Sequence, residues 1–200
     1  MKHRTIKFLS LTPLIAALPV YAGVREGDVN IGVTASSQLR GIYFGGPIEL
    51  PEINGPLFGW GLDDPGFFTI ENPIPTEGMF VPGEGANIVL EVIAFDPALK
   101  GWTPGFASVF DDPGETWNIG LVPFDEHAFW HIDSTDPGFI PPPTQTEWSA
   151  TFRLLDTGST GYLPSDPITL TFTPEPTSLT MLAVGGVLLA GRRRRLNAAS

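Results

Sequence analysis

The chain has 200 residues, no cysteine and a formal net charge of −11 at pH 7; the lack of cysteine excludes disulfides, thiolate metal sites and thiol nucleophiles. Its length suits about one domain. The segment 23–173 carries four basic and 21 acidic residues, a net charge of −17, and because such a surface repels phosphate groups we expect no nucleic acid partner.

The first 22 residues have the pattern of a secretory signal peptide. The basic start MKHRTIK is followed by the apolar run FLSLTPLIAALPV, and Val20 and Ala22 supply small residues at positions −3 and −1. Pro13 and Pro19 argue against a buried helix, because proline interrupts helical hydrogen bonding. We therefore expect export across the inner membrane and cleavage by signal peptidase after Ala22.

The segment 23–173 is predicted to be an all-β domain. Short runs rich in β-branched and aromatic residues alternate with turns rich in proline and glycine, which is typical of strands. In WSATFRLL, alternate residues from Trp148 to Leu154 fall on one face, which is the period of a half-buried strand. The expected strands cover residues 27–33, 37–44, 86–96, 106–110, 116–122, 127–133, 146–156 and 167–173.

The turns between these runs predict the architecture. Asp-Pro pairs recur there, and aspartate followed by proline favours the first corner of a turn. Short strands separated by such turns predict a two-layer antiparallel β-sandwich, Ig-like or jelly-roll. The stretch 44–85 lacks strand rhythm, so we expect a long loop with one or two short strands. Its expected packing residues are Leu57, Phe58, Trp60, Phe67 and Phe68.

The segment FDEHAFWHID holds His127 and His131, the two histidines of the predicted mature chain. On a strand, His127, His131 and Asp133 would share one face, and imidazoles with a carboxylate suit Zn²⁺. Strand residues four apart lie about 13 Å apart, whereas zinc bonds are about 2 Å long, so such a site requires a bulge or turn. Two interpretations stay open: structural packing, which we favour, and a metal site.

Other chemistry has weaker signals. The pairs Asp63-Asp64 and Asp111-Asp112 could join backbone carbonyls around Ca²⁺, although turn formation is the favoured interpretation. The serine-nucleophile elbow, the phosphate-binding loop and the HExxH zinc motif are missing from the sequence. We therefore expect no enzymatic activity.

The chain ends with Pro174-Glu175-Pro176, an apolar run from Leu179 to Ala190, and the four arginines Arg192, Arg193, Arg194 and Arg195. As a helix the run reaches about 18 Å, short of a hydrocarbon core of about 30 Å. The arginines would hold that end on the cytoplasmic side of the membrane. This composition predicts a transient membrane helix instead of a permanent anchor.

The order and spacing of these three parts resemble the PEP-CTERM sorting signal of Gram-negative bacteria that make extracellular polysaccharide. The resemblance covers residues 174–200, and five residues follow the arginines. It implies recognition by an exosortase, a membrane enzyme, and removal of the tail near Pro174, Glu175 and Pro176. It also implies release or attachment of the remaining protein at the cell surface.

Three segments are thus expected: a signal peptide over 1–22, a β-sandwich domain over 23–173 and a sorting signal over 174–200. The leading hypothesis is a non-enzymatic, exported protein with a structural or adhesive role at the cell surface or in the exopolysaccharide matrix, without a cofactor. The alternative is a surface protein that binds a divalent metal, Zn²⁺ or Ca²⁺. A secreted glycan hydrolase ranks third.

Overall fold

A computed structural model describes residues 24–175, and they form an all-β domain, as predicted. The predicted signal peptide with Ala22, the residue Pro176, the apolar run and Arg192 to Arg195 lie outside the described residues. Within residues 24–175, no helix is long and apolar enough to cross a bilayer.

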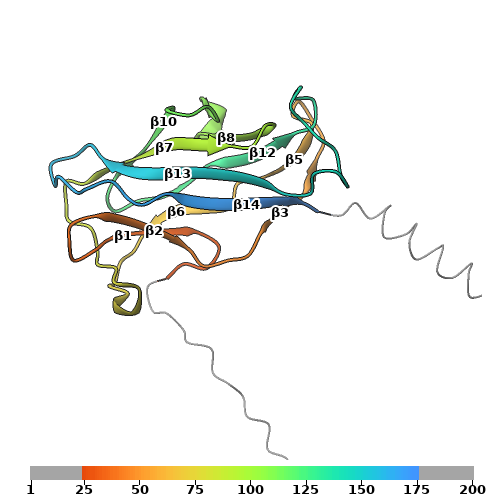
Figure 1. The fold of residues 1–200 in the computed structure, drawn as a ribbon. Helices are drawn as coiled ribbons and strands as arrows, with labels where there is room; N and C mark the ends of the chain where they lie inside the picture. The colour runs from red at the N-terminus through yellow and green to blue at the C-terminus, as the bar shows by residue number, and fades with distance from the viewer. Residues whose placement is uncertain (1–23, 176–200) are drawn as a thin grey trace, which may run out of the picture.

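The strands and short helices follow one another along the chain as shown in Figure 1. Their bounds are β1 Val29–Val33, β2 Leu39–Tyr43, β3 Ile48–Leu50, β4 Glu52–Ile53, β5 Gly59–Leu62, β6 Gly66–Thr69, the 3-10 helix η1 Pro75–Glu77, β7 Asn87–Phe95, β8 Leu99–Trp102, the 3-10 helix η2 Pro104–Phe106, β9 Val109–Phe110, β10 Thr116–Leu121, β11 Asp125–His127, β12 Phe129–Asp133, β13 Trp148–Asp156 and β14 Ile168–Pro174.

These strands form three sheets. The first has the order β11-β6-β1-β2, the second β10-β7-β13-β14-β3, and the third β4-β5-β12-β8-β9. In Figure 1, β7, β13 and β14 of the second sheet lie over β1, β2 and β6 of the first. The main core cluster takes buried side chains from all three sheets.

Two of the strand pairings are parallel, whereas the sequence predicted antiparallel sheets. β1 pairs in parallel with β6, and β14 pairs in parallel with β3. Both β3 and β6 come from the stretch 44–85, which supplies four strands where one or two were expected. Of its expected packing residues, Phe67 is fully buried, but Phe58 is 57% exposed and does not pack as predicted.

The strand predicted from WSATFRLL is confirmed as β13. Trp148, Ala150, Phe152 and Leu154 are fully buried, whereas Ser149 and Thr151 are half-buried and Arg153 is exposed. Each large apolar side chain buried in this way contributes about 1.5–3 kcal/mol to folding. Because β13 pairs with both β7 and β14, it forms the centre of the second sheet.

Trp130 of β12 connects the three sheets. Its ring centroid lies 6.3 Å from that of Phe67 in the first sheet and 5.0 Å from that of Phe172 in the second. Its Nε1–H donates a hydrogen bond to the carbonyl oxygen of Pro65 at 2.9 Å. The fully buried indole therefore fixes β12 against the turn that precedes β6.

The predicted strand 127–133 is divided in the structure. β11 ends at His127 and pairs with β6 in the first sheet, whereas β12 begins at Phe129 and pairs with β5 and β8 in the third. The fully buried Ala128 lies at the crossing. His127 and His131 therefore belong to different sheets, and the prediction that they share one face of one strand is wrong.

Candidate metal centre around His127

Three metal-ligating side chains converge at one edge of the first sheet. Within residues 24–175, Asp28, Asp64 and His127 form the one such group found, and their ligand atoms all lie within 4.8 Å of one another. The strand pairing explains this arrangement. Asp28 directly precedes β1, Asp64 lies just before β6, and His127 ends β11 opposite Gly66. Because β6 pairs with both β1 and β11, their ends meet.

Asp28 is the buried member of the group, with 4% of its surface exposed. Its Oδ1 accepts a hydrogen bond from the backbone N–H of Gly66 at 2.8 Å, and its Oδ2 lies 3.6 Å from Nε of Arg25. A buried carboxylate is costly unless it is paired or hydrogen-bonded, and these two contacts supply both kinds of partner. They also fix the direction of the carboxylate.

His127 is only partly buried, and both of its ring nitrogens face oxygen atoms. Its Nδ1 lies 2.8 Å from the carbonyl oxygen of Asp63 and 3.1 Å from Oδ1 of Asp64, while its Nε2 lies 3.5 Å from Oδ1 of Asp125. A Cβ atom at Gly66 would come within 2.7 Å of the imidazole. Glycine at this position therefore allows the ring to lie directly against β6.

The carboxylates create a negative potential at the site. Burial lowers the pKa of His127, but the hydrogen bond to Asp63 and the charges of Asp28, Asp64 and Asp125 raise it, and the net pKa is above the ordinary value. Burial, followed by the charges of Asp28 and Asp64, raises the pKa of the nearby Tyr43 hydroxyl. The shift of His127 favours the positively charged imidazolium, and the shift of Tyr43 favours the neutral phenol over the phenolate.

Arg25 supplies one of these positive charges. Its guanidinium forms ion pairs with Asp28 and with Asp125, and lies 4.5 Å from the centroid of the Phe68 ring. The hydrogen bond to Asp125 is the main cause that raises the pKa of Arg25. The three aspartates of the site, Asp28, Asp64 and Asp125, therefore face one permanent cation and one titratable imidazole.

The group opens onto a surface hollow of about 580 Å³. Two further acidic residues, Glu26 and Glu49, line this hollow together with Tyr43. Asp64 lies at its rim with 57% of its side chain exposed. Solutes can therefore reach Asp64 and His127 from solvent, whereas Asp28 is buried.

Of the three residues predicted as a zinc site, His127, His131 and Asp133, the structure places only His127 in this group. His131 is 1% exposed, its Nε2–H donates to the carbonyl oxygen of Phe58 at 3.1 Å, and burial lowers its pKa. Oδ1 of Asp133 accepts hydrogen bonds from the backbone N–H and the hydroxyl of Thr135 at 2.9 and 2.7 Å. Both residues thus have structural partners in and beside the third sheet.

The second acidic pair makes a turn. A carboxylate oxygen of Glu115 accepts the backbone N–H groups of Asp111 and Asp112 at 2.9 and 3.0 Å, and these bonds lower the pKa of Glu115. Asp111 also forms an ion pair with Lys100 at 3.1 Å. The pair Asp63-Asp64, in contrast, lies at the His127 group.

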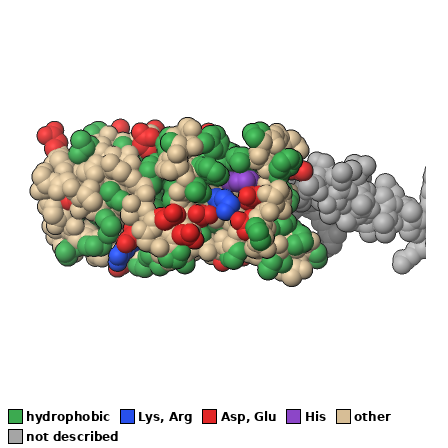
Figure 2. Space-filling view, turned by 90° about the horizontal axis from the view of Figure 1, so that it is seen from above, with side chains coloured by type: hydrophobic (Ala, Val, Ile, Leu, Met, Phe, Trp, Pro, Cys, Tyr) green, Lys and Arg blue, Asp and Glu red, His purple; other side chains and the backbone are tan. Residues whose placement is uncertain are grey.

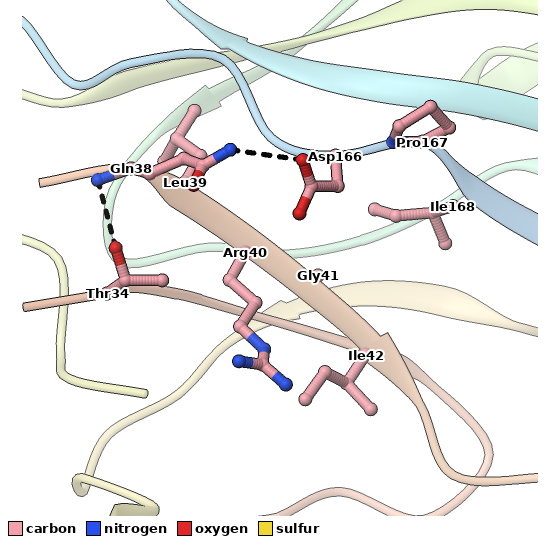
Figure 3. Close-up of a pocket in the computed structure, with 9 residues that line it drawn as sticks. All are labelled: Thr34, Gln38, Leu39, Arg40, Gly41, Ile42, Asp166, Pro167 and Ile168. Atoms are coloured by element: carbon pink, nitrogen blue, oxygen red, sulfur yellow. Dashed lines mark hydrogen bonds between the residues drawn. The ribbon is translucent and has the colours of Figure 1, made fainter. Parts of the chain in front are cut away.

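A second hollow, of about 370 Å³, lies beside β2 (Figure 3). Gln38 donates hydrogen bonds there to Oδ1 of Asp166 at 3.3 Å and to Oγ1 of Thr34 at 3.2 Å. Arg40 forms an ion pair with Glu77 at 3.8 Å. The charged side chains of this second hollow thus have partners within the chain. Among the described residues, the hollow contains no group of metal ligands.

The remaining cations of the domain are paired in the same way. Lys100 lies 3.0 Å from a carboxylate oxygen of Asp136, and Arg153 forms an ion pair with Glu91. Figure 2 shows this pattern on one face, where carboxylates adjoin the few basic side chains.

No family model, curated protein or solved structure matches this chain.

Proposed function

We propose that this protein is exported and then sorted to the cell surface by an exosortase that removes its C-terminal tail. Its β-domain has a non-enzymatic, structural or adhesive role in the surface layer or the exopolysaccharide matrix. The proposal combines the two terminal sequence patterns with the contacts that the described residues make next to them.

The position of the last described strand at the start of the Pro-Glu-Pro motif is the observation that carries the proposal. Pro174 is the last residue of β14 and pairs with Leu50 of β3. The backbone N–H of Glu175 donates a hydrogen bond to the carbonyl oxygen of Leu50 at 2.8 Å. The domain thus extends two residues beyond the predicted boundary at residue 173, and cleavage after Glu175 would leave every described strand intact.

The N-terminal end of the domain gives matching support. Arg25 would be the third residue after signal peptide cleavage, and its backbone N–H donates to Oδ1 of Asn30 at 2.8 Å. The Nδ2–H of the same fully buried Asn30 donates to the carbonyl oxygen of Arg25 at 2.9 Å. The described part of the domain is therefore fixed by hydrogen bonds close to both predicted processing sites.

The finer architecture is part of the same proposal. We propose a two-layer β-sandwich, Ig-like or jelly-roll in type, in which the first and second sheets face each other. The main core cluster and the contacts of β2 with β13 and β14 support this arrangement. The two parallel pairings would be local departures from an antiparallel sandwich.

Processing of the tail tests the sorting proposal. We expect Glu175→Ala, or deletion of Arg192 to Arg195, to leave uncleaved precursor in the inner membrane of the native host. Glu84→Ala, at an exposed glutamate within the domain, is the matched control and should mature normally. Normal maturation of both tail variants, or an intact arginine tail on protein recovered outside the cell, would contradict the proposal.

The non-enzymatic role has its own test. The purified mature protein should not hydrolyse the host polysaccharide or model esters. Sustained turnover that disappears with substitution of a single carboxylate would instead support the glycan hydrolase hypothesis.

A further inference from the structure

We infer that Asp28, Asp64 and His127 bind a divalent transition-metal ion, with Zn²⁺ as the best match. The Asp63 carbonyl oxygen is the fourth protein ligand. This site differs from the one predicted from the sequence, because it uses His127 without His131 or Asp133. It is also independent of the proposed sorting, since it lies entirely within the described domain.

The distances fit a tetrahedral ion. Zinc bonds to nitrogen and oxygen are about 2.1 Å long, so tetrahedral ligands lie about 3.4 Å apart. Nδ1 of His127 lies 3.1 Å from Oδ1 of Asp64 and 2.8 Å from the carbonyl oxygen of Asp63. The Asp28 carboxylate lies within 4.8 Å of the other side-chain ligands. It would have to move toward them by up to about 1.4 Å for all four atoms to bind one ion at the tetrahedral spacing. The ion then replaces the proton on Nδ1.

The kind of ligand selects the kind of metal. Calcium takes six to eight oxygen ligands, and magnesium prefers oxygen ligands and water in an octahedron. This site offers one imidazole nitrogen and three protein oxygens. That set suits zinc and the neighbouring first-row ions, which bind imidazole well.

The surroundings of His127 match those of a metal ligand. A ligating histidine usually donates its other ring N–H to a carboxylate or carbonyl, which orients the ring and makes it a stronger ligand. Here Nε2 faces Oδ1 of Asp125 at 3.5 Å, an ion-pair distance, so a small movement of either side chain would form that hydrogen bond. The buried Asp28 is held by the backbone N–H of Gly66, so it is already oriented before the ion arrives.

The plain alternative is a surface ion-pair network in which a protonated His127 and Arg25 neutralise the aspartates. The two interpretations predict different behaviour. An ion-pair network needs no metal, and substitution of Asp28, Asp64 or His127 would then leave the zinc binding of the protein unchanged. A metal centre binds one ion per chain and depends on each ligand.

The test uses the full chain, purified in mild detergent and stripped of metal with a chelator. Isothermal titration with ZnCl₂ and with CaCl₂ measures stoichiometry and affinity, and the visible spectrum of the Co²⁺ form reports tetrahedral coordination. We expect one Zn²⁺ per chain and much weaker Ca²⁺ binding. We expect His127→Ala and Asp64→Asn each to weaken Zn²⁺ binding at least 100-fold.

Asp166→Asn, at an aspartate of the second hollow, is the matched control and should bind zinc normally. Near-ultraviolet circular dichroism checks that every variant is folded. For Asp28→Asn, which removes a buried charge, retained folding with lost zinc binding supports the site. Absence of stoichiometric Zn²⁺ binding, or binding that survives His127→Ala, would overturn the inference. Zinc binding in protein that is never processed would still support it, so its failure and that of the sorting proposal are distinguishable.

Discussion

His127 and His131 stand four residues apart in the sequence but have opposite surroundings. His127 ends a strand of the first sheet, is partly exposed and faces carboxylates that raise its pKa. His131 lies inside the third sheet, is almost fully buried, and burial lowers its pKa. The chain passes from the first sheet to the third at Ala128, and this places His127 where a charged ring is favoured and His131 where a neutral ring is favoured.

The comparison shows that local sequence does not decide the role of a histidine here. Both residues have acidic neighbours in the chain. Only His127 also lies next to carboxylates from distant segments of the chain, because β6 pairs with both β1 and β11.

The largest expected effect comes from truncation of Trp130, which lies between the two histidines in the sequence. Trp130→Ala should lower the free energy of unfolding by about 3–5 kcal/mol, because truncation of a buried aromatic ring leaves a cavity. The indole contacts rings from the other two sheets, so both histidine environments should loosen together. Urea unfolding measures the loss, and a loss below about 1 kcal/mol would contradict the role of Trp130 as the connection between sheets.

The next effect compares the histidines directly, in metal-free protein. His131→Ala should cost about 2–3 kcal/mol, since it opens a cavity and removes the hydrogen bond to the Phe58 carbonyl. His127→Ala should cost less than about 1 kcal/mol, because exposed ion pairs contribute little to stability. Equal losses in thermal or urea unfolding would show that the two environments do not differ as described.

The pH dependence of stability distinguishes the two rings further. Because the pKa of His131 is lower in the folded chain, the unfolded chain binds more protons below the ordinary histidine pKa of about 6.5. The contribution of His131 is therefore complete above that pH and is lost as the pH falls toward the folded pKa. His127 has a raised pKa, so its contribution is complete at low pH and is lost as the pH rises.

Urea unfolding of metal-free protein between pH 5 and 8 checks these opposite slopes. His131→Gln should remove the loss of stability toward low pH, whereas His127→Gln should remove the loss toward high pH. Identical pH profiles for the two variants would contradict the assigned shifts.

The smallest effect concerns the permanent cation beside His127. Arg25→Gln should strengthen zinc binding about fivefold, because it removes one positive charge near the aspartates, a gain of about 1 kcal/mol at the high effective dielectric of a surface site. The same titration of Arg40→Gln is the control, since Arg40 pairs with Glu77 beside the second hollow. Weaker binding in Arg25→Gln would show that Arg25 supports the site instead of opposing the ion.

The sequence predicts best where one sheet face is buried along a long strand. Trp148, Ala150, Phe152 and Leu154 alternate with polar residues, and this regular pattern fixes which face of β13 is buried. It predicts poorly where glycine replaces the alternating side chain, as in GWGL of β5 and GFFT of β6. At Gly61, a Cβ atom would meet the ring of Phe129 at 2.5 Å, so the residue that hides the strand pattern is required by its neighbour.

The candidate site could be predicted only in parts. His127 is a visible metal ligand, and the pair Asp63-Asp64 is a visible acidic turn, but Asp28 carries no local signal. These residues meet because β6 pairs in parallel with β1, and a parallel pairing between distant segments leaves little trace in a single sequence. The division at Ala128 likewise has no turn signal in the sequence, because residues 125–133 contain neither glycine nor proline.

The position of β14 has a mechanical consequence. Its neighbours are β13 on one side and β3 on the other, and Glu175 at its C-terminal end is hydrogen-bonded to Leu50. A pull on that end acts along the strand, so the hydrogen bonds to both neighbours are loaded together in shear instead of being opened one at a time. If the protein is held by this end in flowing water, the force therefore acts in the direction in which the sheet best resists unfolding.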